Sequence, residues 1–505
     1  MKRALTLALA MFACAHSSAP AHEPPRAADA GTAPPAAKAG LLPGEQVLSK
    51  RPEPPPLAPF DAPVPEVRSL SNGLKVYVVS RPESAIEALL LVVKRGAAAD
   101  PPLLPGLASV TAEMLEAGSA GRGQAEVARA ADELGATLTV SAEEDGTLVG
   151  ISGLAGKLSA MTALLSDVAL RPNLSVDDWR RIQARRTAEL LADRARPEVA
   201  ADHAFRAAVY GAHPLGHAES GTPESLKAMR ITHVKEFFAT FTPEDSAIVA
   251  VGGADPAAAV AALEKAFGSW HPGKKSQMHP PAQGEVPSER PRLVAVDFPG
   301  KPQSVLRVGE PSVPRSSPDY LALRALNVVL GGSFTSRLNQ NLREKHGYTY
   351  GAFSRFAFGV GPGPFAVRTD VKTDATGAAL KEILEELQQI LSAPFSPEDL
   401  DKGKALLAAG LVQELETSDS TALAIADLFL FDLPLDEYRT FVPRLKALTV
   451  ADVQGAARRA LHPEAMTITF AGDVAKVEPL LKAEPSLSSL PRPQIRDADG
   501  KLKRK

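Results

Sequence analysis

Residues 226–234, LKAMRITHV, and residues 445–453, LKALTVADV, are near copies of one another. Each copy leads through a proline into an apolar run that ends in a glycine, Gly252 in the first case and Gly472 in the second. The two offsets agree closely (445 − 226 = 219 and 472 − 252 = 220). One match could arise by chance, but repeated matches at one offset predict that the folded part of the chain is a duplicated domain.

A third match supports the duplication and predicts where two long helices begin. Ser175 and Ser396 (396 − 175 = 221) each open an S-x-x-D pattern, in which the serine caps a helix. In each copy, runs of β-branched and apolar residues are followed by segments with helical periodicity. Runs of strands followed by runs of helices are typical of the α+β class. We therefore expect two homologous α+β domains, each an antiparallel-rich sheet with helices packed on one face.

The composition is that of a large globular protein. The chain has 505 residues, of which 45% are hydrophobic and 23% are charged, and 56 basic against 59 acidic residues leave a formal net charge of -3. Because one domain typically takes roughly 100–200 residues, the length favours two or more domains. The charge balance gives no indication of nucleic-acid binding. The single cysteine excludes an intramolecular disulfide and a cysteine-rich metal site.

The N-terminus has the features of an export signal. Lys2 and Arg3 precede an apolar stretch, residues 4–13, that is too short to span a bilayer as a helix. Cys14 follows directly, so the segment resembles a bacterial lipoprotein signal in which the cysteine becomes lipidated. The alternative is ordinary signal cleavage after Ala21, which discards Cys14. We expect a location on the periplasmic side of the bacterial cell envelope, either lipid-anchored or, with ordinary cleavage, soluble in the periplasm or secreted.

Composition also predicts the other boundaries. An Ala- and Pro-rich stretch with almost no periodic apolar pattern follows the signal and indicates an extended tether. A Pro-, Gly- and polar-rich stretch between the two copies indicates a linker. The predicted organisation is a signal segment (1–14), a tether (15–65), a first domain (66–271), a linker (272–290), a second domain (291–482) and a polar tail (483–505).

Motifs in both copies carry a family resemblance. In the first copy, Pro105-Gly106-Leu107-Ala108 opens a helix after a strand-turn-strand pattern. The second copy contains Ser336-Arg337-Leu338, Leu342-Arg343-Glu344-Lys345 and Gly347-Tyr348-Thr349-Tyr350. Together these motifs resemble the insulinase/pitrilysin family of zinc peptidases, in the two-domain class related to the mitochondrial processing peptidase. The resemblance covers about residues 66–480 and implies half of a peptidase clamshell.

The resemblance also implies a zinc site, whose residues are replaced in this chain. The family motif is HxxEH, in which two histidines one helical turn apart bind zinc and the glutamate takes a proton from bound water. Alignment on Gly106-Leu107-Ala108 puts Ser109, Ala112 and Glu113 at the positions of the first His, the Glu and the second His. Glu189 lies close to the position of the family's distant glutamate ligand (189 − 113 = 76). A single carboxylate cannot hold zinc, so we expect no metal in this chain.

No other histidine pair replaces the lost motif. His213 and His217 have i, i+4 spacing, but Pro214 and Gly216 between them indicate a loop. Neither HxxEH nor HExxH occurs anywhere in the sequence. A self-sufficient zinc peptidase is therefore not expected.

Two sets of residues are expected to contact a peptide substrate. In the family, an Arg and a Tyr of the second domain bind the substrate backbone and stabilise the oxyanion on the scissile carbonyl, and the resemblance assigns these roles to Arg343 and Tyr350. The family also binds extended peptides along an exposed strand edge of the first domain. The matching residues are Gly135, Ala136, Thr137 and Leu138, with a strand expected at about 136–140.

These observations lead to one preferred hypothesis and two alternatives. The preferred function is that of a non-zinc subunit of a heterodimeric insulinase-type metallopeptidase, inactive alone, with zinc held by an HxxEH-containing homologous partner. The first alternative is a non-catalytic scaffold or peptide-binding protein on the same fold. The second is a tethered envelope protein unrelated to proteolysis. No nucleic-acid partner is expected under any of them.

Overall fold

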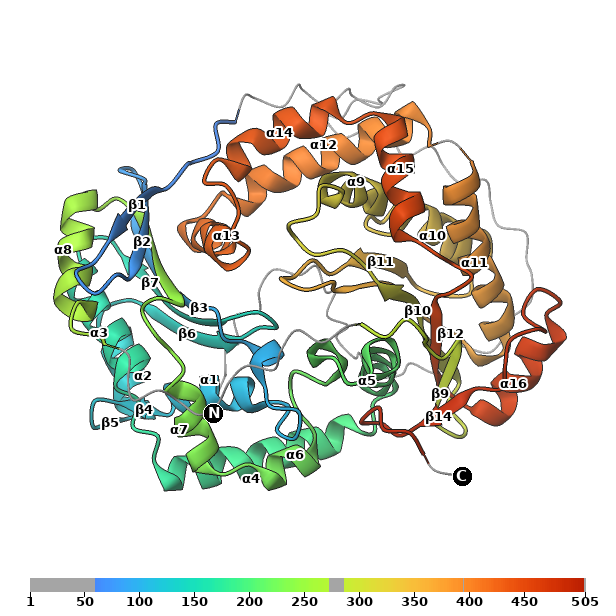
Figure 1. The fold of residues 1–505 in the computed structure, drawn as a ribbon, viewed down its shortest axis with the longest axis horizontal. Helices are drawn as coiled ribbons and strands as arrows, with labels where there is room; N and C mark the ends of the chain where they lie inside the picture. Colours follow the sequence, from blue (N-terminus) through green and yellow to red (C-terminus); the bar gives the residue numbers. More distant parts are fainter. Residues whose placement is uncertain (1–59, 272–285, 394, 504–505) are drawn as a thin grey trace, which may run out of the picture. The chain divides into compact units, whose positions relative to one another are not determined.

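The computed structural model describes residues 60–271, 286–393 and 395–503 (Figure 1). The predicted signal segment with Cys14, nearly all of the tether and most of the linker lie outside the described residues. From Ala58 onward the chain forms one compact unit. Within the described ranges, none of the helices has the length and apolarity needed to cross a bilayer.

The first copy extends from β1 to α8. Its strands are β1 (Glu66–Ser69), β2 (Lys75–Ser80), β3 (Ile86–Val93), β4 (Gly118–Ser119), β5 (Arg122–Gly123), β6 (Thr137–Ala142), β7 (Thr147–Leu154) and β8 (Ser246–Gly252). Its helices are α1 (Leu107–Glu116), α2 (Gln124–Glu133), α3 (Leu158–Leu170), α4 (Val176–Asp193), α5 (Pro197–Tyr210), α6 (Pro223–Ala228), α7 (Ile231–Phe238) and α8 (Pro256–Phe267), with the short turns η1 (Ala97–Ala99) and η2 (Pro214–Gly216).

The second copy begins at β9. Its strands are β9 (Leu293–Asp297), β10 (Gln303–Pro311), β11 (Ala352–Phe356), β12 (Pro364–Lys372), β13 (Thr467–Gly472) and β14 (Gln494–Arg496). Its helices are α9 (Tyr320–Leu330), α10 (Arg337–Asn339), α11 (Thr376–Ser392), α12 (Pro397–Glu414), α13 (Ser418–Leu430), α14 (Glu437–Ala447), α15 (Val450–Ala460) and α16 (Val474–Ala483), with the π-helical turn η3 (Gln340–Lys345) and the short turn η4 (Thr373–Ala375).

Strand order shows that the two copies have one topology. The first sheet runs β1-β2-β8-β3-β7-β6 and the second runs β14-β9-β13-β10-β12-β11. From β2 and from β9 onward, equivalent strands occupy equivalent places. Most neighbours are antiparallel, and the exceptions are β2 with β8, β9 with β13 and β9 with β14. The predicted duplication and the α+β class are therefore confirmed.

The predicted helix starts at Ser175 and Ser396 are also present. The Ser175 hydroxyl accepts a hydrogen bond from the Asp178 amide at 3.1 Å and caps α4. The Ser396 hydroxyl accepts one from the Asp399 amide at 2.9 Å and caps α12. Each cap satisfies an amide that the first helical turn leaves without a backbone partner.

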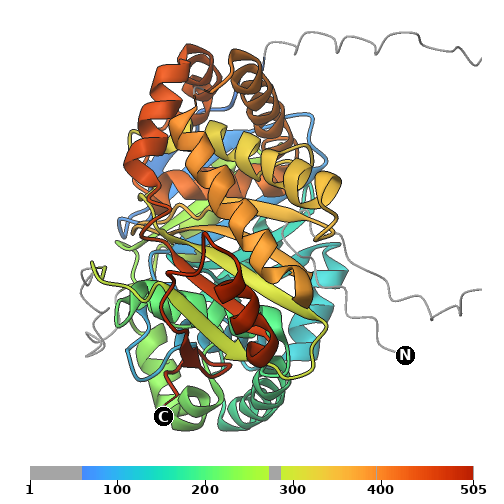
Figure 2. The same cartoon turned by 90° about the vertical axis from the view of Figure 1, so that its right-hand side faces the viewer.

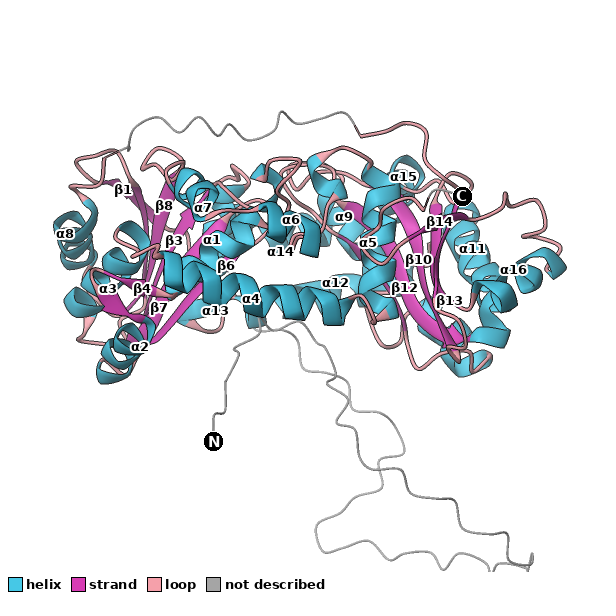
Figure 3. Ribbon diagram, turned by 90° about the horizontal axis from the view of Figure 1, so that it is seen from below, coloured by secondary structure: helices cyan, strands magenta, loops and turns pink. Residues whose placement is uncertain are grey.

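Each sheet carries its own helices on one face and one exchanged helix on the other (Figures 1 and 3). In Figure 2 the orange and red helices α11 and α16 lie in front of the second sheet. On the opposite face of that sheet, α5 of the first copy packs against β9, β10 and β13. In return, α13 of the second copy packs against β3 and β8 of the first sheet. The sequence predicted the helices of one face and did not predict this exchange.

The exchange explains why the central strands are apolar on both faces. In β2, Val76 and Val78 pack on helices of the first copy, whereas Tyr77 faces the other way and joins the core that contains Phe429 of α13. The rings of Tyr77 and Phe429 pack edge to face, with their centroids 6.3 Å apart. Successive side chains of a strand point to opposite faces, so a strand covered on both sides reads as a continuous apolar run.

The C-terminal segment is not only the polar tail that the sequence predicts. Residues 494–496 form β14, which pairs in parallel with β9 at the edge of the second sheet. Beyond it, Asp499 receives two hydrogen bonds of 3.1 Å from the Nε of Arg194 in the first copy. Lys501 pairs with Glu224 at 3.2 Å. This segment therefore links the two copies, a role that its polar composition did not indicate.

Candidate functional site

The degenerate metal motif lies on α1, whose start is fixed by a buried carboxylate. Asp100 accepts hydrogen bonds from the amides of Gly106 at 2.6 Å and Ala108 at 2.8 Å. Burial raises the pKa of Asp100 to about 8. Gly106 has φ +90°, and a Cβ there would lie 2.8 Å from Gly221, so only glycine fits this turn. The helix start is therefore held in place from two sides.

An arginine of α4 faces the motif positions. The Nη1 of Arg186 donates to the Ser109 hydroxyl at 3.1 Å and forms an ion pair with Glu113. Its Nη2 donates to the carbonyl of Ser220 at 2.9 Å. Arg186 is only 7% exposed. Ser109 and Glu113, one helical turn apart on α1, thus share one guanidinium, while Ala112 between them offers no polar atom.

Glu189 belongs to the same ion-pair network as Glu113. Its carboxylate accepts a hydrogen bond from Arg185 at 3.1 Å, and its side chain is 53% exposed. Arg185 also pairs with Glu113. The residue of α4 that faces both Ser109 and Glu113 is Arg186, three positions earlier. Arg185 thus joins Glu189 to Glu113, and the assignment of Glu189 to the third-ligand position stays a prediction.

The donor set at this site does not fit zinc. Zinc needs three or four nitrogen, sulfur or carboxylate ligands, and here a hydroxyl, a methyl group and one carboxylate stand at the motif positions. The carboxylate is already neutralised by two arginines. Elsewhere in the described ranges, no group of three or more His, Cys, Asp or Glu side chains converges as a metal site would require. His213 and His217 are separated by η2, and each bonds locally, to the Leu215 amide and to the Ala218 carbonyl.

The expected substrate edge is β6, which ends the first sheet. The strand begins at Thr137, so Thr137 and Leu138 belong to it, whereas Gly135 and Ala136 form the turn after α2. Among the strands of the described ranges, β7 alone pairs with β6. The Val140 amide points away from β7, because it donates to the Glu116 carboxylate of α1 at 3.0 Å. Alternate residues of an antiparallel strand face the same way, so Leu138 also presents its backbone to the free edge.

The equivalent edge of the second sheet is covered at its start. The Ala352 amide of β11 donates to the Asn339 side chain at 2.9 Å, and the Ser354 amide donates to the Gly331 carbonyl at 3.1 Å. The outward amides of Ala352 and Ser354 are thus filled by the segment that joins α9 to β11. On β6, by contrast, no hydrogen bond within the described residues reaches the outward backbone of Leu138.

Arg343 and Tyr350 lie in that same joining segment. Arg343 belongs to η3, and its guanidinium stacks over the ring of Phe334 at 4.4 Å. Its closest acid is Glu344 at 3.5 Å. The turn at Gly347, with φ +64°, leads to Tyr350, which is 86% exposed. Among the described residues, the Tyr350 hydroxyl has no hydrogen-bond partner, so it is free to meet a ligand or another chain.

The structure brings only some of the predicted site residues together. Ser109, Glu113 and the newly found Arg186 form one cluster, and Glu116 joins it to the β6 edge. No described hydrogen bond or ion pair connects this cluster to Arg343 or Tyr350. The sequence analysis missed Arg186 and Glu116. Both have a signal in the sequence, because Arg185 and Arg186 are adjacent on the predicted helix and Glu116 follows the motif by about one helical turn.

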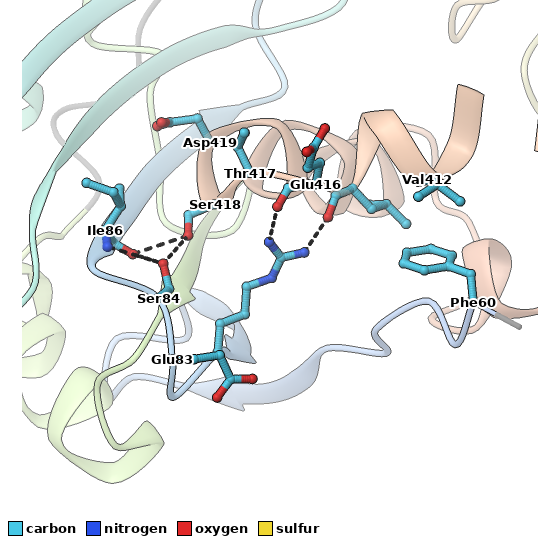
Figure 4. A pocket seen from close by; sticks show the side chains of 11 residues that line it. Phe60, Glu83, Ser84, Ile86, Val412, Glu416, Thr417, Ser418 and Asp419 are labelled. Carbon is cyan, nitrogen blue, oxygen red and sulfur yellow. Dashed lines mark hydrogen bonds between the residues drawn. The ribbon is translucent and has the colours of Figure 1, made fainter. Parts of the chain in front are cut away.

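A pocket lies elsewhere, where α13 meets the first copy (Figure 4). Arg81 donates to the carbonyls of Leu415 and Glu416 at the end of α12. The hydroxyls of Ser84 and Ser418 are 3.1 Å apart. None of the sequence-predicted site residues lines this pocket. Its polar groups are used to join the two copies.

The fold and the site define a class: a duplicated peptidase-like chain whose metal motif has lost its ligands. Comparison with known families agrees. A family model described as "Insulinase (Peptidase family M16)" matches residues 75–222, and one described as "Peptidase M16 inactive domain" matches residues 229–407. The chain belongs to the insulinase family of peptidases, among members with an inactive domain.

Relatives of this chain include proteins with and without a peptidase name. It is 26% identical over 404 residues to an uncharacterized zinc protease of Mycobacterium leprae, over 79% of this chain and 86% of that protein. It is 22% identical to a Helicobacter pylori protein named a non-peptidase homolog, over 72% and 84%. The crystal structure of a peptidase M16 inactive domain from Pseudomonas fluorescens matches with a TM-score of 0.73 at 25% identity, over 81% and 98%. The hypothesis of an unrelated envelope protein therefore loses its basis.

Proposed function

We propose that this chain is the non-zinc subunit of a heterodimeric insulinase-type metallopeptidase. It would be inactive alone and would act with a homologous partner that carries HxxEH and the zinc ion. The observation that carries the proposal is an asymmetry between the two copies. The first copy has no ligand set for zinc, yet the second copy presents Arg343 and an unpartnered Tyr350.

The chemistry of these two residues suits peptide hydrolysis in trans. Attack on a peptide carbonyl develops negative charge on its oxygen, and a guanidinium and a phenol are donors that stabilise such charge. Within this chain neither donor contacts the α1 cluster. Their exposure is compatible with reaching a reacting group held by another subunit. The open β6 edge would add main-chain hydrogen bonds to an extended peptide.

Reconstitution tests the proposal directly. The purified chain is mixed with a candidate HxxEH protein, such as one encoded by a neighbouring reading frame, and cleavage of a fluorogenic peptide is measured. We expect activity from the mixture and from neither chain alone. Arg343→Ala or Tyr350→Phe should each lower kcat/KM by roughly 10²–10³. Lys345→Ala and Tyr348→Phe, in the same segment, are the matched controls and should leave the rate near that of the wild type. Unchanged activity in both Arg343 and Tyr350 variants would contradict the catalytic role.

A second function is favoured by one observation, the open β6 edge beside a site that cannot hold zinc. On this alternative, the chain is a non-catalytic scaffold or peptide-binding protein; the Helicobacter pylori relative is named a non-peptidase homolog. Co-purification in a stable assembly without any HxxEH chain, together with peptide binding without cleavage, would favour it over the subunit role.

We further propose a location on the periplasmic side of the bacterial envelope, with Cys14 as the lipid-bearing residue. The support is the signal-like sequence alone. Metabolic labelling with a radioactive fatty acid tests it, since Cys14→Ser should abolish the label and release the protein from the membrane fraction. A soluble, unlabelled wild-type protein that begins after Ala21 would instead establish ordinary signal cleavage.

A further inference from the structure

We propose that Phe334 is a positioning residue, whose ring holds the Arg343 guanidinium in the orientation in which it meets a substrate oxygen. The inference rests on the proposed function, because it concerns the residue that would bind the scissile peptide. It goes beyond that function, since it adds a residue that acts through Arg343 and not on the substrate itself.

The first argument is the contact between the ring and the guanidinium. The Cζ atom of Arg343 lies 4.4 Å from the centroid of the Phe334 ring, which is within the range of a cation–π contact. The nearest acid, Glu344, lies 3.5 Å away and has a half-exposed side chain. An ion pair between exposed side chains does little to fix either partner. Among the described contacts, the ring therefore does most to set the direction of the guanidinium.

The second argument is a donor without an acceptor. The Nη1 atom of Arg343 is shielded from solvent and has no hydrogen-bond acceptor among the described residues. Such a group costs free energy and is rare in folded proteins. The stack keeps the guanidinium in this position although the described chain offers it no acceptor there. Because the side chain as a whole is 33% exposed, a bound peptide can reach the guanidinium and supply an oxygen.

The third argument is that the chain fixes Phe334 in an exposed place. The Ser333 carbonyl on one side of it accepts a hydrogen bond from the Asn339 side chain at 3.3 Å. The Thr335 carbonyl on the other side accepts one from Lys402 at 3.1 Å. The ring between them is 63% exposed and belongs to none of the described core clusters. A ring that is held in place without being buried contributes little to the core and is available to the guanidinium.

The turn that carries Arg343 is fixed as well. The side-chain amide of Asn341 donates to Glu382 at 2.9 Å and to Glu386 at 2.8 Å, so η3 is tied to α11. Leu342, next to Arg343, is fully buried. With the backbone of η3 held in this way, loss of the Phe334 ring frees the guanidinium and leaves the turn in place.

Kinetics of the reconstituted peptidase, at saturating partner, test the role in the reaction. Phe334→Ala should lower kcat about fivefold with little change in KM, and Phe334→Tyr should keep the wild-type rate because its ring also has a π face. Phe334→Leu keeps the apolar bulk without that face and should be as slow as Phe334→Ala. In an Arg343→Ala background, Phe334→Ala should have no further effect.

Phe353→Ala is the matched control for these kinetics. It removes a ring of similar exposure on β11 that has no described contact with Arg343, and it should leave kcat near that of the wild type. An equal loss in the control, full activity in Phe334→Leu, or a further loss from Phe334→Ala in the Arg343→Ala background would each overturn the proposal. So would a defect that disappears when more partner is added, because it would assign the ring to subunit docking.

Chemical modification of the chain alone tests the stack without a partner. Phenylglyoxal reacts with accessible guanidinium groups, and peptide mapping by mass spectrometry gives the rate at Arg343. We expect this rate to rise several-fold in Phe334→Ala and to stay unchanged in Phe353→Ala, with little change in Tm for either. An unchanged rate in Phe334→Ala would overturn the positioning role and leave the proposed function standing. Failed reconstitution together with a raised rate would contradict the proposed function but not the hold of Phe334 on Arg343.

Discussion

Glu116 is expected to compete with a bound peptide for the β6 edge. Its carboxylate accepts the Val140 amide at 3.0 Å, and that amide faces the direction in which a new strand would pair. A peptide that adds to β6 needs the same donor for one of its own carbonyls. Glu116→Ala frees the amide and should therefore tighten peptide binding.

The size of the effect follows from the hydrogen bond that is removed. A hydrogen bond to a charged group contributes about 1.5–3 kcal/mol, and less where water reaches it. Because the Glu116 side chain is partly exposed, we take about 1 kcal/mol, which corresponds to roughly a fivefold lower Kd. Fluorescence anisotropy of a labelled extended peptide measures this change. Glu133→Ala, an exposed glutamate just before the same strand, changes the charge equally and is the control.

The same contact predicts a pH dependence of peptide binding. Burial raises the pKa of Glu116, although the Val140 hydrogen bond opposes the shift. As the pH falls through this raised pKa, the carboxylate gains a proton and its hold on the Val140 amide weakens. Wild-type Kd should therefore decrease toward acid pH, whereas the Kd of the Glu116→Ala variant should change little. Weaker binding by Glu116→Ala, or an equal pH profile in both proteins, would refute the competition.

Four further outcomes follow from other contacts. Leu138→Pro removes an outward amide of β6 but no β6–β7 bond, so peptide binding should weaken at least tenfold with little change in Tm. Burial raises the pKa of Asp100 from 3.8 to about 8. The contribution of the protonated Asp100 to the free energy of unfolding is therefore complete below pH 4 and is lost as the pH rises through 8. Asp100→Asn should flatten this decline in denaturant titrations across that range. Phe429→Ala removes a ring buried between the copies and should lower the free energy of unfolding by about 3–5 kcal/mol in denaturant titrations. Asp499→Ala should speed hydrogen exchange in β14, and unchanged exchange would show that the Arg194 contact does not hold the C-terminal segment.

Much of the fold could be predicted from local patterns, and the limits have physical causes. The duplication was visible because both copies keep the same helix caps, as at Ser175 and Ser396. The exchange of α5 and α13 between the copies could not be predicted, since an apolar helix face does not specify which sheet will cover it. The ion pairs of Arg185 and Arg186 with Glu113 were not predicted, because an interval in sequence does not show which side chains of two helices meet. The strand β14 was missed because it has only three residues and two of them, Gln494 and Arg496, are polar.

The asymmetry between the copies has one structural origin, the segment that leads to the last edge strand of each sheet. In the first copy, residues 117–136 pass through α2 and leave the Leu138 backbone at the free edge. In the second copy, residues 331–351 instead place Asn339 and the Gly331 carbonyl on the amides of β11. That same segment carries Arg343 and Tyr350 outward. Covering the start of the β11 edge and presenting the Arg/Tyr pair are thus two results of one sequence difference. A chain built from two equal folds can therefore offer a strand edge in one copy and a guanidinium and a phenol in the other.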